Sequence, residues 1–393
     1  MRKFSADYIY PVSSPPLEQG VVITDDDGII LAIEAREQHD PATLQIYPGA
    51  LIPGFVNTHC HLELSHMKGM MDTGIGLLEF IKGVVTRRQA PPEVIEAAIR
   101  QAEQDMVESG IVAVGDISNV ADSFPVKSEG RLRYYTFVEV LDFLRHSGSE
   151  KAMNNALDVF HQVHPAPGST ASIVPHAPYT VSATLLDKIK SFNKPGGITV
   201  SVHNQETAAE NEFFQSKTGD FLPFYAGFGN NLEEFEATGR NSIFYEMNGL
   251  HPQNRNLFVH NTFTTGEEIR AVQAWSPNVY WATCPNANLF IENRLPDYRI
   301  FLENNARITL GTDSLASNWQ LSVLEEMKTI ARYQSYISFE MLLQWATLNG
   351  AQALGFDDTL GSLEPGKKPG ILCLEGLEPG GRLGVGARVR RVV

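Results

Sequence analysis

The sequence predicts an α/β protein, in which a parallel sheet with crossover helices is joined to a small β domain built from both chain ends. Three observations support this. Short apolar segments alternate with longer stretches of helical periodicity through the middle of the chain, as in proteins with parallel sheets. Roughly the first fifty and the last thirty residues instead contain β-prone runs broken by glycine and proline. The 393 residues, 43% of them hydrophobic, are enough for one large domain or two moderate ones.

The two chain ends have the patterns of short strands and turns. Runs 20–24 and 29–34 flank Asp25-Asp26-Asp27-Gly28, a turn-forming sequence that predicts a β-hairpin. Residues 370–374 are apolar, and nearby Pro365 and Gly366 disfavour a helix. We expect the ends to pair into one domain of residues 1–52 and 358–393, leaving 53–357 for the larger domain.

The middle of the chain contains eight candidate strands separated in several places by helical patterns, such as 92–109 and 321–333. Eight β/α units suit a closed barrel of about 250 residues or more, whose chemistry lies at the carboxyl ends of the strands. An open, doubly wound sheet is the alternative. The candidate strands are 50–58, 111–117, 133–140, 171–175, 198–202, 256–259, 279–283 and 307–311.

Composition excludes several classes of function. The net charge of −15 opposes general binding to nucleic acid and to anionic membrane surfaces. The chain has no apolar run of about 18 residues, and its start lacks the apolar core of a signal peptide, so we expect a cytoplasmic protein that does not enter membranes. Its three cysteines are too few for a disulfide framework.

Metal-capable residues gather at the ends of the candidate strands. His59 and His61 are two residues apart, so in an extended chain both imidazoles point to the same side and could share one metal ion. A pair of surface histidines would give the same motif. His203 at the end of the fifth strand could supply a third nitrogen ligand, and Glu206 lies close enough behind it to reach a metal-bound water.

Two more polar residues follow later strands. His260 comes after the sixth and Asp313 after the eighth, although an isolated Asp there would usually be a helix N-cap. Three histidines and an aspartate, with one position left for water, form a plausible catalytic Zn²⁺ site, and Fe²⁺ or Mn²⁺ is chemically acceptable. Such an ion lowers the pKa of bound water to about 7. A second ion normally needs a bridging carboxylate, often a carbamylated lysine at the end of a strand. The fourth strand ends at His176 with no lysine nearby, so we expect a single ion.

At these residues the chain resembles the amidohydrolase superfamily, in the branch of deaminases and chlorohydrolases. The resemblance implies a distorted (β/α)8 barrel flanked by a β-sandwich from both termini. It implies that His59, His61, His203 and Asp313 are metal ligands, that Glu206 shuttles protons, that His260 orients the attacking water, and that His176 contacts substrate. Relatives usually have Ala-Asp where this chain has Pro369-Gly370. The resemblance is carried, in order, by PGFVNTHCHLELS, PHAPYTVS, HNQE, the His260 segment, LGTDSLASN, ATLNGAQALG and LGSLEPGKKPG.

Within that branch the motifs are most similar to those of aminodeoxyfutalosine deaminases. The expected activity is therefore hydrolytic deamination of a 6-aminopurine nucleoside derivative, in which metal-bound hydroxide attacks the carbon bearing the amine and Asp313 or Glu206 helps ammonia leave. The alternatives are a deaminase of S-adenosylhomocysteine, methylthioadenosine, guanine or cytosine, a chlorohydrolase, or a non-catalytic metal-binding barrel.

The sequence determines other contacts with substrate or partners less closely. Glu63 is a candidate substrate-binding residue, although it could equally pair with a neighbouring cation. The segment 207–253 is long and rich in aromatic residues, which predicts either a lid or a helical insertion packed on the barrel. The expected partner is a small-molecule substrate, and a homodimer is possible.

Overall fold

The computed structural model describes residues 1–163, 170–378 and 381–393, and it has the α/β architecture predicted from the sequence. Eight parallel strands form two four-stranded sheets, with strand orders β11-β10-β9-β8 and β12-β13-β14-β15. Strand order follows chain order in each sheet, whereas a doubly wound sheet reverses direction part-way. The strands are β8 (Phe55–Cys60), β9 (Ile111–Ser118), β10 (Arg133–Val140), β11 (Thr170–Pro175), β12 (Thr199–Asn204), β13 (Arg255–His260), β14 (Val279–Thr283) and β15 (Ile308–Leu310).

Hydrogen bonds cross between the two sheets at both edges. Thr58 Oγ1 donates to the Leu310 carbonyl at 2.9 Å, and an isolated parallel bridge joins Cys60 to Asp313. At the other edge, Ser172 Oγ donates to the Thr199 carbonyl at 2.7 Å. Neither edge forms a regular ladder within the described residues, so the eight strands make a distorted arrangement.

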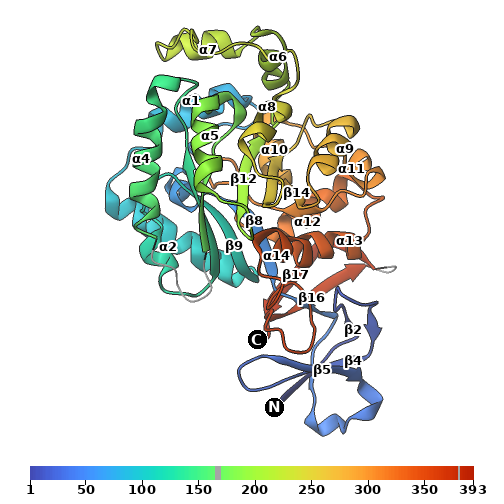
Figure 1. Cartoon of the computed structure of the whole chain (residues 1–393). Helices are drawn as coiled ribbons and strands as arrows, with labels where there is room; N and C mark the ends of the chain where they lie inside the picture. The colour runs from blue at the N-terminus through green and yellow to red at the C-terminus, as the bar shows by residue number, and fades with distance from the viewer. Residues whose placement is uncertain (164–169, 379–380) are drawn as a thin grey trace.

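The terminal segments form two further sheets, with orders β5-β4-β1-β6 and β17-β16-β7-β2-β3. In the second, β16 from the C-terminal segment pairs antiparallel with β7. The division into 1–52 with 358–393 and 53–357 stays a proposal. Figure 1 shows both chain ends together at this end of the molecule. The strands are β1 (Arg2–Ser5), β2 (Tyr8–Ile9), β3 (Leu17–Glu18), β4 (Gly20–Thr24), β5 (Ile30–Ala35), β6 (Gln45–Ile46), β7 (Ala50–Pro53), β16 (Ile371–Glu378) and β17 (Arg382–Arg391).

The single strand predicted over 50–58 is wrong in one respect, because the structure divides it at Gly54. Residues before Gly54 belong to the terminal sheet and residues after it begin the first parallel sheet. A Cβ at position 54 would lie 2.3 Å from Val112 Cγ1 and 2.7 Å from the Pro369 carbonyl oxygen. Only glycine fits where the chain passes from one sheet to the other.

Fourteen α-helices within the described residues surround and cap the strands. The two helices predicted over 92–109 and 321–333 are present as α2 and α12, and their ends lie within two residues of the predicted ones. The helices are α1 (Leu77–Arg87), α2 (Pro92–Glu108), α3 (Phe124–Lys127), α4 (Ser149–Phe160), α5 (Ala183–Phe192), α6 (Ala208–Ser216), α7 (Phe221–Gly227), α8 (Ser242–Gly249), α9 (Gly266–Trp275), α10 (Pro285–Glu292), α11 (Tyr298–Glu303), α12 (Val323–Tyr333), α13 (Phe339–Ala346) and α14 (Leu348–Leu354).

Helices α6 and α7 extend beyond the end of the parallel strands that lies opposite the terminal sheets (Figure 1). Most of their aromatic side chains are buried: the rings of Phe213 and Phe221 stack with centroids 5.2 Å apart, and Phe221 lies 4.8 Å from Tyr179. Phe228 is an exception and is exposed. The aromatic residues of the 207–253 segment therefore mainly form a core that packs the insertion onto the parallel strands.

Among the described residues, no helix is both long and apolar enough to cross a membrane. His164 lies outside the described residues.

Candidate active site

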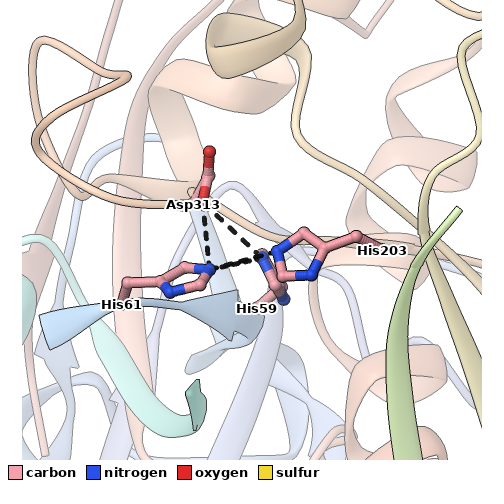
Figure 2. A group of neighbouring side chains, drawn as sticks. All are labelled: His59, His61, His203 and Asp313. Carbon is pink, nitrogen blue, oxygen red and sulfur yellow. Dashed lines mark hydrogen bonds and ion pairs between the residues drawn. The ribbon is translucent and has the colours of Figure 1, made fainter. Parts of the chain in front are cut away.

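Four side chains that are far apart in the sequence point their metal-capable atoms at one another (Figure 2). His61 Nε2 lies 3.2 Å from His59 Nε2 and 3.3 Å from His203 Nε2. Asp313 Oδ1 lies 3.6 Å from His59 Nε2 and 3.4 Å from His61 Nε2. All four residues are buried, and the four atoms lie within 4.8 Å of one another.

The parallel strands position these ligands at their carboxyl ends. His59 belongs to β8 and His203 to β12, each as the last residue but one of its strand. The strands predicted from the sequence ended one residue before each histidine. Asp313 follows β15 with φ of 58°, a left-handed conformation that turns its side chain toward the histidines. A Cβ on the preceding Gly311 would lie 2.8 Å from His59 Cβ, so only glycine allows the close approach of β8 and β15.

The spacing of the four atoms fits a single metal ion. Ligand atoms about 2.0–2.1 Å from a tetrahedral Zn²⁺ are separated from one another by about 3.3 Å. The two histidine contacts, at 3.2 and 3.3 Å, match this separation. His203 donates its Nδ1 hydrogen to the His176 carbonyl at 2.7 Å, which leaves Nε2 free to act as a ligand.

The protonation of these residues also suits metal binding. Burial lowers the pKa of His61 to about 3 and that of His203 well below its usual range, with the neighbouring histidines adding to both effects. Burial alone would raise the pKa of Asp313, but its interactions with His59, His61 and His260 outweigh this effect and hold that pKa below its ordinary value. Neutral imidazoles and an ionised carboxylate are the forms that bind divalent cations.

Glu206 and His260 lie beside this group as a candidate acid–base pair. Glu206 Oε2 is 3.7 Å from His260 Nε2, and both side chains are buried. His260 Nδ1 is 2.8 Å from Asn288 Oδ1, which fixes its hydrogen on that side and directs the Nε2 lone pair toward Glu206. Burial, reinforced by the charge of Asp313, raises the pKa of Glu206 well above its usual value. A carboxyl that holds a proton more readily than usual, beside an imidazole, is suited to accept a proton and return it during a reaction.

A cavity of about 320 Å³ opens onto these groups. His61, His203, Glu206, His260 and Asp313 line it. The remainder of its wall is largely apolar and comes from α1 and the loops after β10 and β11, including Leu77, Phe80, Val84, Leu141, Phe143 and Tyr179. A pocket of this size and lining suits a small, partly apolar ligand.

Of the two candidate substrate-binding residues, His176 lines the cavity and Glu63 does not. His176 Nδ1 lies 2.7 Å from Thr180 Oγ1. One oxygen of Glu63 pairs with Arg88 at 3.0 Å and the other accepts the Asn119 and Val120 backbone N–H groups. For Glu63, the structure shows the alternative of pairing with a neighbouring cation, and contact with substrate stays a prediction.

Several residues that line the cavity were not predicted from the sequence. Glu139 is the penultimate residue of β10, and it lines the cavity together with Asn119. The rule that located the histidines, polar residues at the carboxyl ends of predicted strands, would also have found Glu139. Arg88 lies at the end of α1, and no local pattern in the sequence marks it.

A family model described as the amidohydrolase family matches residues 50–383. The chain belongs to the amidohydrolase family. This confirms the resemblance found in the motifs, and with it an α/β hydrolase that acts on C–N bonds other than peptide bonds. Members of this family use a divalent metal, which agrees with the four convergent ligands.

Curated relatives of this amidohydrolase act on amino-substituted nucleosides. An aminodeoxyfutalosine deaminase of Nitratiruptor is 28% identical over 82% of this chain and 77% of its own length. A 5′-deoxyadenosine deaminase of Methanococcus vannielii is 26% identical over 81% and 72%. An adenosine deaminase of Helicobacter pylori is 26% identical over 88% and 86%.

Solved structures share the fold. A Helicobacter pylori aminofutalosine deaminase in complex with methylthio-coformycin superposes with a TM-score of 0.82, at 23% identity over 96% of this chain and 93% of that one. An adenosine deaminase from Xanthomonas campestris with bound zinc gives 0.74, at 23% identity over 95% and 84%. A zinc-containing atrazine chlorohydrolase from Arthrobacter aurescens gives 0.76, at 17% identity over 97% and 89%.

Proposed function

We propose that this amidohydrolase is a deaminase of 6-aminopurine nucleosides, of the kind represented by aminodeoxyfutalosine and 5′-deoxyadenosine, and that it works with one divalent ion, Zn²⁺. The observation that carries the proposal is the convergence of three histidines and Asp313 beside a buried Glu206, in a chain whose curated relatives are nucleoside deaminases. The ligand set would also accept Fe²⁺ or Mn²⁺.

His59, His61, His203 and Asp313 would hold the ion. When bound there, a divalent cation supplies Lewis acidity and so lowers the pKa of water to about 7. Glu206 accepts the proton that the attacking water loses and passes it to the ring nitrogen beside the reacting carbon. His260, whose Nδ1 hydrogen is held by Asn288, offers its Nε2 as a hydrogen-bond acceptor that orients the water.

The exocyclic amine then leaves. Water has added across the C=N bond of the ring, with its oxygen on the carbon and one proton on the ring nitrogen. The bond to the amine then breaks, ammonia leaves with the proton of the new hydroxyl, and an oxo group remains on the ring. The departing nitrogen takes a proton by way of Glu206 or Asp313, both of which line the cavity.

The test uses purified, zinc-loaded enzyme and an ammonia-coupled assay. The panel contains aminodeoxyfutalosine, 5′-deoxyadenosine, adenosine, guanine, cytosine and a chlorotriazine. We expect the highest kcat/KM for an adenine nucleoside. Chloride release from the chlorotriazine without ammonia release from any purine would replace the proposal with a chlorohydrolase, and inactivity on the whole panel at full metal occupancy would contradict it.

A further inference from the structure

The cavity wall holds one carboxylate that the proposed reaction does not use. Glu139, at the carboxyl end of β10, is 6% exposed and lines the cavity. Its Oε2 accepts a hydrogen bond from Asn119 Nδ2 at 2.9 Å. Its Oε1 is buried and has no hydrogen-bond partner in the part of the chain that the structure describes. A buried carboxylate oxygen without a partner is costly, so its presence beside a cavity calls for a ligand.

The nearest histidine does not satisfy this oxygen. His203 Nδ1 lies 3.5 Å from Glu139 Oε1, but it donates its hydrogen to the His176 carbonyl at 2.7 Å. The Nε2 of His203 faces the other metal-capable atoms. Neither nitrogen therefore has a hydrogen available for Glu139, and Oε1 remains an open acceptor.

Neighbouring residues hold Glu139 in place. Asn119 donates both to the Glu139 carboxylate and, at 3.3 Å, to its backbone carbonyl. The backbone N–H of Asn119 is fixed by Glu63, which in turn pairs with Arg88. This chain of polar contacts keeps the carboxylate in one orientation before any ligand arrives, which is how a binding site gains specificity.

Glu139 lies on the Nδ1 side of His203, whereas the other metal-capable atoms lie on its Nε2 side. Its carboxylate is outside the set of four convergent ligand atoms, although it lies within 4.8 Å of nitrogens of His176 and His203. The reacting carbon must approach the other side of His203, near Glu206. A 6-aminopurine nucleoside has no ring N–H, so its only hydrogen-bond donors are the amine that leaves and the hydroxyls of the sugar.

We propose that Glu139 is a specificity-determining residue that accepts a hydrogen bond from a sugar hydroxyl of the substrate. The inference rests on the proposed function and adds to it the requirement for a hydroxylated sugar. A hydrogen bond to a charged group contributes enough that its loss lowers kcat/KM by about ten- to a hundredfold.

The test compares adenosine with its 2′-deoxy and 3′-deoxy analogues in zinc-loaded enzyme. In the wild type, we expect one of the two analogues to lose about ten- to a hundredfold in kcat/KM, mainly through KM. In Glu139→Gln this discrimination should shrink several-fold, and in Glu139→Ala it should disappear. Binding of inosine and of its deoxy counterpart, measured by calorimetry, should show the same pattern without turnover.

The matched control is Glu246→Gln. Glu246 is also fully buried, and neither of its carboxylate oxygens has a hydrogen-bond partner among the described residues, but it does not line the cavity. This variant should discriminate between the nucleosides as the wild type does. An equal loss on all three nucleosides in the Glu139 variants would overturn the proposal, since a structural role alone predicts that result.

Metal analysis separates the remaining outcomes. One zinc ion per chain in the wild type and in both Glu139 variants is expected. A second ion that is lost in Glu139→Gln would overturn the proposal, because Glu139, His176 and His203 would then form a metal site. A wild type that deaminates no nucleoside refutes the proposed function and this inference together, whereas an active wild type without hydroxyl discrimination refutes only the role of Glu139.

Discussion

At the scale of single residues, the proposed reaction depends on a carboxyl group that is buried beside the ligands without belonging to them. Glu206 is outside the four-atom group, so its side chain can change without removing a ligand. We expect Glu206→Gln to lower kcat by about 10²- to 10⁴-fold, the usual contribution of general acid–base catalysis. The measurement is steady-state kinetics with metal analysis of the same sample, in which metal content should be unchanged.

The matched control for this variant is Glu210→Gln. Glu210 is a buried carboxyl one helical turn further along, where it accepts hydrogen bonds from the Gln205 and Glu206 backbone N–H groups and does not line the cavity. Its loss should lower activity less than the loss of Glu206. Normal turnover in Glu206→Gln at full metal occupancy would remove Glu206 from the mechanism.

A second buried carboxyl gives a prediction about pH and stability. Burial, with a smaller effect from the charge of Glu210, raises the pKa of Glu246 from 4.5 to about 8. The folded state therefore favours the neutral acid, and this stabilisation is complete below pH 4.5 and is lost as the pH rises through about 8. Glu246→Gln, which is neutral at every pH, should have an unfolding temperature close to that of the wild type at pH 5 and above it at pH 9.

Thermal unfolding at pH 5, 7 and 9 with equal metal loading checks this expectation. Glu236→Gln, a change at an exposed position, serves as the control and should give the same difference at every pH. If the Glu246 variant also differs from the wild type by a constant amount, the folded protein tolerates the ionised carboxylate and the prediction fails.

At the scale of the elements, a buried ion pair supports the segment that carries His61. Asp116, in β9, accepts the Leu62 backbone N–H at 2.9 Å and pairs with Lys127 at 2.5 Å. The Asp116 side chain is fully buried, and that of Lys127 is 8% exposed. Removing one partner of a buried pair leaves an uncompensated charge and costs about 3–5 kcal/mol.

We therefore expect Asp116→Asn to lower the free energy of unfolding by about 3–5 kcal/mol, as measured by urea denaturation. Zinc affinity should also fall, because an asparagine oxygen accepts the Leu62 N–H more weakly than a carboxylate does and holds the residue after His61 less firmly. The double variant Asp116→Asn with Lys127→Met should recover much of the stability, since no charge is left unpaired. If the double variant is as unstable as the single one, the hydrogen bond to Leu62 outweighs the ion pair.

The elements also show what sequence can and cannot predict. The parallel strands were predictable because buried strands are near-continuous apolar runs, and β10 and β14 have the expected bounds. The division of the first strand at Gly54 was not, because the contacts that require glycine there come from Val112 and Pro369. The partner of Glu63 was equally hidden, since Arg88 reaches it from the end of a helix.

At the scale of the whole molecule, the proposed metal ion would connect the two parallel sheets. His59 and His61 come from the first sheet, whereas His203 and Asp313 come from the two edges of the second. Within the described residues one hydrophobic core packs side chains of both sheets, such as Val56 and Leu257, but the hydrogen bonds between the sheets are scattered and include one isolated bridge. A ligand that binds only the folded state stabilises it by about 2.7 kcal/mol at a hundred times its Kd. The ion should therefore stabilise the entire parallel-strand domain in addition to supporting the reaction.

Removal of the metal with a chelator should abolish activity and lower the unfolding temperature of the domain in one cooperative transition, and one equivalent of Zn²⁺ should restore both. Calorimetry with metal analysis measures this. His61→Ala, which lacks one of the four ligands, should bind zinc weakly and show little response to the chelator. If the chelator abolishes activity in the wild type but leaves its unfolding temperature unchanged, hydrogen bonds at the two edges suffice to hold the sheets together, and the ion serves the chemistry alone.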